Sequence, residues 1–163
     1  MNNYARTPSE FEEKIIQVNR VSKKTKGGNQ IGFSVLVVVG DRKGRVGVAL
    51  GKGPDVMSSI KKSVRKAKKR FIVVPLKQGT IPFAITTKYG AAKILLKPAP
   101  VGSGIIAGGA VRSVVEVAGI KNIVGKVLGS NNQANNAYAT FKALQQIRQL
   151  VAVRHIPLDS PKN

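Results

Sequence analysis

The sequence predicts an α+β fold made of two small units, and three observations support this prediction. An alternating run of β-branched residues at 31–39 has the period of a strand, and a lysine-rich amphipathic segment follows it at 54–71. The second half changes composition, becoming rich in glycine, alanine, valine and isoleucine, and again carries strands and helices. With 163 residues, of which 42% are hydrophobic, the chain is long enough for one domain or for two small ones.

The net charge is the strongest signal of function. The chain has 28 lysines and arginines against 7 acids, which gives a formal charge of +21. Self-repulsion of this size disfavours a compact chain and indicates a polyanionic partner, with nucleic acid first and an acidic membrane surface second. Residues 20–77 hold 16 of the 28 basic side chains and only two acids, so their net charge is +14, two-thirds of the total.

The first unit is predicted to begin with strands. We expect one at 13–21, with Ile16 and Val18 at alternate positions, and another at 31–39. Residues 40–44 follow as a hairpin loop with glycine where a positive φ is needed, and a returning strand carries Val46, Val48 and Leu50. The predicted apolar face of the second strand consists of Ile31, Phe33, Val35, Val37 and Val39.

A helix is predicted to begin at 53–55, with Pro54 at the first helical position and Asp55 in the first turn. Its apolar stripe, which would lie on the sheet, consists of Val56, Met57, Ile60, Val64, Ala67 and Phe71. The rest of its circumference is basic and consists of Lys61, Lys62, Arg65, Lys66, Lys68, Lys69 and Arg70. A solvated helix face usually interleaves acids at i,i+4 spacing, and none occurs at 58–70. The pattern therefore favours RNA or another polyanion over simple solvation.

The second unit is predicted to start after a boundary at 76–82. We expect strands at 81–89 and 92–97, a proline break, a glycine-rich turn into a helix at 106–118, and a strand at 120–128. A last helix at 132–150 would place on one face Ala134, Ala137, Tyr138, Phe141 and Leu144. The glycines of 101–110 are expected to let a helix pack closely on its sheet or on a neighbouring molecule.

Three basic segments of the first unit are candidate RNA-binding surfaces. Segment 21–30 is predicted to be a flexible loop whose glycines let the backbone approach a phosphate, although a hairpin loop kept soluble by lysine is the alternative. None of the eight aromatic residues lies within the basic stretches 21–30, 42–45 and 61–70. We therefore expect contacts with RNA backbone and shape, as in double-stranded-RNA-binding domains, and no platform for base stacking. The candidate residues are Arg20, Ser22, Lys23, Lys24, Lys26, Gly27, Gly28, Arg42, Lys43, Arg45, Lys52, Lys61, Lys62, Arg65, Lys66 and Lys69.

The sequence offers little for catalysis or for binding cofactors and metals. It has no cysteine and no P-loop motif, and the glycines of 101–110 depart from the dinucleotide-binding spacing. His155 is the single histidine, and Glu10, Glu12 and Glu13 would point to alternating faces of a strand. We therefore expect no enzyme, no cofactor, no metal site and no small-molecule substrate. Because the chain has no cysteine, no apolar run as long as a membrane span and no signal-like N-terminus, the simplest interpretation is a cytoplasmic protein of a reducing compartment.

Two stretches resemble the signatures of the bacterial small-subunit ribosomal protein S-five family. The first contains Asn19-Arg20-Val21-Ser22-Lys23, Lys26-Gly27-Gly28, Gly44-Arg45-Val46-Gly47 and Gly51-Lys52. The second contains residues 104–110, Arg112, residues 116–119, Asn122 and Lys126. The resemblance implies an extension at 1–10, a double-stranded-RNA-binding-like domain of three strands and one helix at 11–76, the C-terminal S-five α+β domain at 77–150, and a tail at 151–163.

The resemblance also implies a function. Members of the family are structural constituents of the small ribosomal subunit that bind its ribosomal RNA at the head–body junction, contact proteins S-four and S-eight, and influence translational accuracy. The surface facing S-four would include Gly104, Gly108, Gly109 and Arg112. The residues leave two alternatives open, namely a free-standing double-stranded-RNA-binding regulator and a truncated phosphotransferase.

Overall fold

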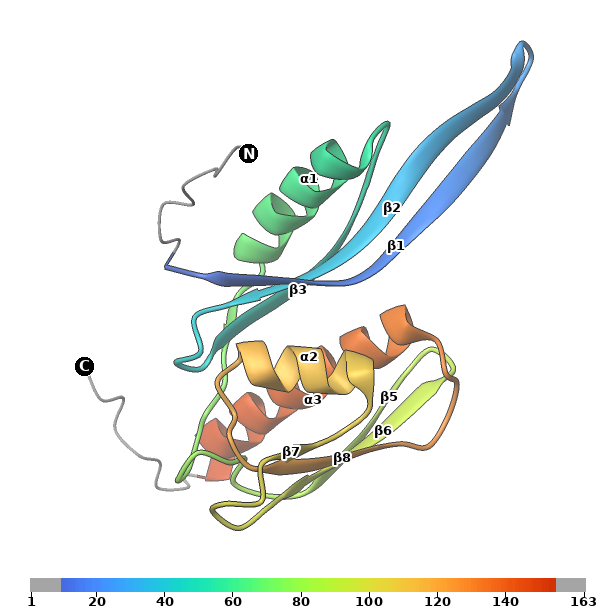
Figure 1. Cartoon of the computed structure of the whole chain (residues 1–163). Helices are drawn as coiled ribbons and strands as arrows, with labels where there is room; N and C mark the ends of the chain where they lie inside the picture. Colours follow the sequence, from blue (N-terminus) through green and yellow to red (C-terminus); the bar gives the residue numbers. More distant parts are fainter. Residues whose placement is uncertain (1–9, 155–163) are drawn as a thin grey trace.

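Two α+β halves pack against each other in the computed structural model, which describes residues 10–154 (Figure 1). The first sheet is antiparallel and has the order β1 (Glu12–Thr25), β2 (Gly28–Gly40), β3 (Arg45–Gly53), β4 (Ile72–Val73), with α1 (Val56–Lys68) on one face. The second sheet has the order β5 (Ile85–Tyr89), β6 (Ala92–Pro98), β8 (Ile123–Val127), β7 (Ile105–Ile106), with β7 parallel to β8. Helices α2 (Gly109–Val117) and α3 (Gln133–Arg154) lie between the two sheets. The predicted α+β class is confirmed, and the first sheet has a fourth, short strand.

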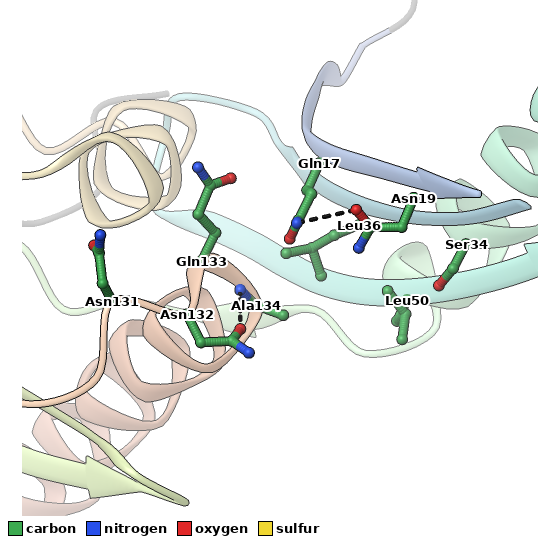
Figure 2. A pocket seen from close by; sticks show the side chains of 9 residues that line it. All are labelled: Gln17, Asn19, Ser34, Leu36, Leu50, Asn131, Asn132, Gln133 and Ala134. Carbon is green, nitrogen blue, oxygen red and sulfur yellow. Dashed lines mark hydrogen bonds between the residues drawn. The ribbon is translucent and has the colours of Figure 1, made fainter. Parts of the chain in front are cut away.

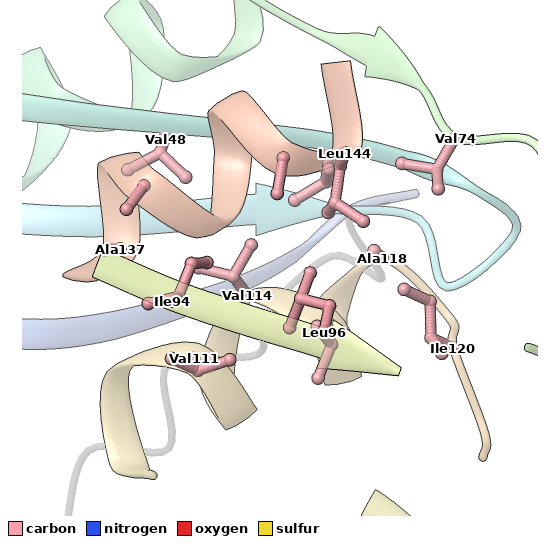
Figure 3. Close-up of a cluster of buried hydrophobic side chains, with 14 of the residues drawn as sticks. Val48, Val74, Ile94, Leu96, Val111, Val114, Ala118, Ile120, Ala137 and Leu144 are labelled. Atoms are coloured by element: carbon pink, nitrogen blue, oxygen red, sulfur yellow. The ribbon is translucent and has the colours of Figure 1, made fainter. Parts of the chain in front are cut away.

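Strand β2 is buried on both faces, whereas the sequence predicted a single apolar face. Val35, Val37 and Val39 pack under α1 with Ala49 and Ala67. The residues between them point the other way, into a larger core that also contains side chains of α2, α3 and the second sheet (Figure 3). That core includes Leu36, Val38, Val46, Val48, Ile94, Leu96, Val114, Ala137 and Leu144. The two halves therefore share a hydrophobic core.

Helix α1 lies close to the sheet because small residues meet along the contact. Its fully buried positions are Ser59, Ser63 and Ala67, and not the larger apolar residues of the predicted stripe; Met57 is 62% exposed. The Ser59 and Ser63 hydroxyls donate hydrogen bonds of 3.0 Å to the carbonyl oxygens of Phe33 and Val35 in β2. A Cβ at Gly51 of β3 would overlap Ser63. Serine–glycine packing therefore sets the helix–sheet distance.

The start of α1 also differs from the prediction. The helix begins at Val56, and Asp55 is its N-cap, whose carboxylate accepts a 2.9 Å hydrogen bond from the Ser58 backbone N–H. Pro54 therefore precedes the cap and does not occupy the first helical position. The hydrogen bonds from the Ser58 side chain and backbone lower the pKa of Asp55, as expected for a carboxylate that satisfies free N–H groups at a helix start.

Strands β1 and β2 continue as a paired two-stranded ribbon through most of the predicted loop at 21–30. Pairing reaches Thr25 and Gly28, and the Thr25 hydroxyl donates a 2.8 Å hydrogen bond to the Gly28 carbonyl across the turn. The expectation of a flexible loop is therefore wrong, because regular β-pairing leaves only a two-residue turn. A register shift between Ile15 and Gln17 turns Ile16 toward the core and ends the predicted alternation with Val18, which is 44% exposed.

The second half follows the predicted order with shifted boundaries. The strand predicted at 81–89 starts at Ile85, because a tight turn at 77–80 and Pro82 precede it. Residues 105–106 form β7, so α2 begins at Gly109 and not at 106, and β8 is shorter than predicted. Helix α3 runs to Arg154, four residues past the predicted end, because Val151 continues its buried side. It is buried around more of its circumference than a single face, since it lies between both sheets.

The hairpin between β2 and β3 docks onto the end of α2. The helix ends in a Schellman arrangement, in which the N–H groups of Gly119 and Ile120 donate to the carbonyls of Glu116 and Val115. The next two carbonyls, of Val117 and Ala118, accept hydrogen bonds of 3.1 and 2.9 Å from the backbone N–H groups of the hairpin residues 42 and 44. The hairpin therefore satisfies carbonyls that a helix end would otherwise leave without partners.

Asp41 organises this hairpin from within. Its Oδ1 accepts hydrogen bonds of 2.8 and 2.9 Å from the backbone N–H groups of Lys43 and Arg45, and its Oδ2 lies 2.7 Å from the Arg45 Nε. Two effects oppose each other at the Asp41 carboxyl. Partial burial alone would raise its pKa, but the hydrogen bonds from Arg45 and Lys43 lower it by more, so the pKa lies below the usual value. The ionised carboxylate is thus the form that the fold stabilises.

Replacing Asp41 with asparagine is expected to lower the free energy of unfolding by about 1–2 kcal/mol at neutral pH. A carboxylate with a lowered pKa stabilises the fold fully above its unfolded pKa, about 3.9, and loses that contribution as pH falls through the folded value. Urea unfolding across a pH series should therefore show a constant difference between parent and D41N above about pH 5 that shrinks below about pH 4. A difference that persists unchanged in strong acid would contradict this origin.

Candidate RNA-binding surface

The β1–β2 ribbon carries the first group of predicted RNA-binding residues. Arg20, Ser22, Lys23, Lys24 and Lys26 are all exposed, and the ribbon projects beyond α1 (Figure 1). By strand alternation, Lys23 points to the face opposite that of its neighbours Ser22 and Lys24. Gly28 has a φ of +126°, and a Cβ at Gly27 or Gly28 would meet nothing within 4 Å. The ribbon therefore presents cations on both faces and an open backbone at its turn.

The outer face of α1 carries the second group. Lys61, Lys62, Arg65, Lys66 and Lys69 are exposed, and within residues 10–154 none of them forms an ion pair. Their neighbour Lys68 differs, because its Nζ lies 3.4 Å from Glu13 and 5.5 Å from the centroid of the Phe11 ring. The prediction of an outward basic face is confirmed, and among the described residues only Lys68 of this face has an acidic partner.

The hairpin tip, the third predicted segment, lies at the opposite end of β2 from the ribbon turn (Figure 1). The Arg42 guanidinium hydrogen-bonds Glu12 and lowers the pKa of that carboxyl, and Arg45 pairs with Asp41 and, at 3.2 Å, with Glu10. Lys43 is exposed and has no ion pair in the part of the chain described. The structure thus separates Arg42, Lys43 and Arg45 from the other two groups and compensates both arginines.

A hollow of 650 Å³ joins the ribbon to the start of α1. It is lined by Ser22 and Lys23 of the ribbon, by Gln30 to Gly32 on the paired strand, and by Lys52 to Pro54 at the end of β3. Lys52 is exposed here. The structure thus brings three of the predicted residues, Ser22, Lys23 and Lys52, to one concave surface.

Of the two roles predicted for the glycine-rich segment, close packing of a helix on its own sheet is wrong, and contact with a neighbouring molecule stays a prediction. A Cβ at Gly102, Gly104 or Gly109 would meet nothing within 4 Å, so these glycines do not let α2 approach its own sheet. Gly102 and Gly104 instead adopt φ values of +94° and +70°. Their backbone N–H groups both donate 3.1 Å hydrogen bonds to the Asn122 side chain. Gly108 is the N-cap of α2, and Arg112 is exposed on the helix. This surface is open to another molecule.

A polar pocket of 390 Å³ lies between the two halves (Figure 2). Gln17 and Asn19 of β1 face it, and the Gln17 amide donates a 3.1 Å hydrogen bond to Asn19. From the other half come Asn131, Asn132 and Gln133, and Asn132 also caps α3 by accepting from the Ala134 N–H at 3.0 Å. The sequence did not predict this cluster, because its amides are more than 100 residues apart along the chain.

Two tyrosines lie beside the basic face of α1, which the sequence did not predict. Tyr89 at the end of β5 and Tyr138 of α3 stack with ring centroids 5.5 Å apart. With Leu50 and Gly51 and four basic residues they line a pocket of 450 Å³; the basic residues are Lys52, Lys62, Lys66 and Arg70. Burial raises the pKa of the Tyr138 hydroxyl. The basic segments contain no aromatic residue, but the fold brings two from the other half against them.

The structure also bears on metal binding and membrane insertion, two functions that the sequence disfavoured. Across residues 10–154, no three histidine, aspartate or glutamate side chains gather as a metal site. No helix in the same part of the chain has the length and apolar character needed to cross a membrane. His155 lies outside the described residues.

Two family profiles match this chain. "Ribosomal protein S5, N-terminal domain" matches residues 11–75, and "Ribosomal protein S5, C-terminal domain" matches residues 87–155. The small ribosomal subunit protein uS5 of Chloroflexus aurantiacus is 50% identical over 141 residues, which cover 86% of this chain and 79% of the relative. The uS5 of Thermotoga neapolitana is 47% identical over 92% of this chain and 86% of its own length. The uS5c of Pyropia yezoensis is 46% identical over 156 residues, which cover 93% of this chain and 90% of the relative.

The first profile covers the half with the ribbon and α1, and the second covers the half with the glycine-rich segment and the tyrosines. Both matches and the level of identity agree with the resemblance that the sequence motifs carry. The family is structural, which confirms the prediction that the protein is not an enzyme. The chain belongs to the ribosomal protein S5 family of small ribosomal subunit proteins.

Proposed function

We propose that this protein binds small-subunit ribosomal RNA at the head–body junction through the β1–β2 ribbon and the outer face of α1. The observation that carries the proposal is the set of cations on α1 other than Lys68, which form no ion pair within residues 10–154, on a chain with a net charge of +21. Each lysine or arginine that contacts a phosphate releases condensed counterions, so many such contacts give strong, salt-dependent affinity. The location at the junction rests on the family resemblance.

The ribbon is suited to hold two RNA segments in a fixed relation. It is exposed on both faces and carries cations on each, so it can contact phosphates of separate strands on its two sides. Continuous pairing to Thr25 and Gly28 makes it more rigid than a loop. A rigid spacer between RNA segments would couple their movements, and this is how we infer an influence on translational accuracy.

The second half provides the proposed protein contacts. The open glycine surface at Gly104, Gly108, Gly109 and Arg112 is our candidate site for protein S-four, because a partner backbone can approach closely where no Cβ intervenes. A contact with protein S-eight is proposed on the family resemblance alone. In this arrangement the protein works in the cytoplasm within the assembled subunit. Membership of a structural family removes the phosphotransferase alternative.

Sedimentation tests the proposal against the free-standing double-stranded-RNA-binding regulator. A tagged copy of the protein in its own cells is expected to co-sediment with small subunits in a sucrose gradient. It should stay with the small subunits when whole ribosomes are separated into their two subunits. After magnesium chelation and high salt it should be released, because phosphate contacts weaken with salt. A regulator would instead remain at the top of the gradient, and a pool found only there would overturn the proposal.

A further inference from the structure

The pocket beside α1 combines a cluster of basic side chains with a stacked pair of tyrosines. Its rim holds Lys52 from β3, Lys62 and Lys66 from α1, and Arg70 just beyond that helix, with no acid among the lining residues. Tyr89 and Tyr138 come from the other half of the protein. The pocket therefore exists only because the two halves pack together.

The cations are arranged along one side. Lys62 and Lys66 are one helical turn apart on α1, and Arg70, in the turn directly after the helix, lines the same pocket as the third cation of the row. The Lys66 ammonium reaches across to the Leu50 carbonyl at 3.3 Å, which places its charge over the pocket. Such a row matches the repeating negative charge of a nucleic-acid backbone.

The tyrosine pair supplies a surface for a base. Tyr89 is 41% exposed, and its ring rests on that of Tyr138 at a centroid distance of 5.5 Å and an interplanar angle of 30°. A ring supported from behind and open in front can accept another flat π-system on its free side. The volume of 450 Å³ falls within the range of about 300–1,000 Å³ that is typical of small-ligand sites.

We propose that this pocket holds an unpaired nucleotide of the bound RNA, with its base against Tyr89 and the adjoining phosphates on Lys62, Lys66 and Arg70. In a duplex the bases are stacked on one another and their faces are unavailable, so the occupant is a looped-out or single-stranded nucleotide. The inference rests on the proposed RNA binding and adds to it a contact with a base, which the sequence argued against.

Tyrosine fluorescence can report this contact because the chain has no tryptophan and only three tyrosines. In a full-length Tyr4→Phe background, the signal comes from Tyr89 and Tyr138 alone. Titration with oligouridylate is expected to quench it, whereas the same strand paired with oligoadenylate should bind with little quenching. Saturating oligouridylate that leaves the fluorescence unchanged would overturn the proposal, as would equal quenching by a polyglutamate peptide.

Affinities of two variants complete the test. Tyr89→Leu keeps an apolar side chain but removes the ring, and should weaken oligouridylate binding at least about fivefold while changing duplex affinity less than twofold. Tyr89→Phe keeps the ring and should bind like the parent, which controls for packing. Equal losses for single strand and duplex, or no loss with Tyr89→Leu, would contradict the pocket assignment. If the parent protein binds neither RNA, the proposed function itself fails, and the two failures are thereby distinguished.

Discussion

Replacing Gly119 with alanine is expected to lower the free energy of unfolding by roughly 2–5 kcal/mol and to loosen the contact between the two halves. Gly119 follows α2 with a φ of +86°, where a side chain costs about 1–2 kcal/mol. A Cβ there would also overlap the Arg42 carbonyl of the docked hairpin. Relieving that overlap moves the hairpin and breaks its two hydrogen bonds to the helix end, each with a net value of about 0.5–1.5 kcal/mol.

Gly102 provides the matched control. Its φ of +94° imposes the same backbone strain, but a Cβ there would meet nothing within 4 Å. Gly102→Ala should therefore lose only the strain contribution, about 1–2 kcal/mol. Urea unfolding of both variants at one pH measures the difference. Equal losses would show that the hairpin tolerates the new methyl group, and that docking adds nothing to the cost.

The elements with regular local patterns were predictable from the sequence. The alternation at 31–39 and the basic face after Asp55 are properties of neighbouring residues, so period and composition suffice to find β2 and the outward side of α1. Boundaries were less accurate where non-local contacts decide them. Helix α3 continues past residue 150 because the Val151 side chain is buried there. The ribbon stays paired as far as Thr25 because each of its two strands hydrogen-bonds the other.

Residues brought together from distant parts of the chain were not predictable. The second buried face of β2 exists because α2 and α3 cover it, and nothing near Leu36 in the sequence signals that. Ser63 resembles an ordinary polar helix residue until Gly51 is placed beneath it. The spacing of glycines is the one signal of this contact in the sequence. Gly47 and Gly51 are four residues apart on β3, so they lie on the same face of the strand, which faces α1. Tyr89 and Tyr138 likewise acquire their basic surroundings only through the packing of the two halves.

Replacing Lys62, Lys66 and Lys69 with glutamine is expected to weaken duplex RNA binding about a hundredfold at roughly 0.1 M salt. Each lysine that contacts a phosphate adds about 0.9 to the slope of log affinity against log salt, so the slope should fall by about 2–3. All three are exposed on α1 and have no ion pair within residues 10–154, so their removal should leave the fold intact. Binding isotherms across a salt series and thermal unfolding measure both expectations.

Three other lysines separate a specific surface from the effect of net charge. Lys93, Lys97 and Lys126 are exposed and share the outer face of the second sheet, away from α1. Changing them to glutamine removes the same three charges from the total of +21. If α1 binds phosphates directly, this control keeps the parent salt slope, because charges beyond about 10 Å are largely screened at 0.1 M salt. Equal slopes for the two triple variants would mean that RNA responds only to overall charge, and that the uncompensated lysines of α1 are merely solvated.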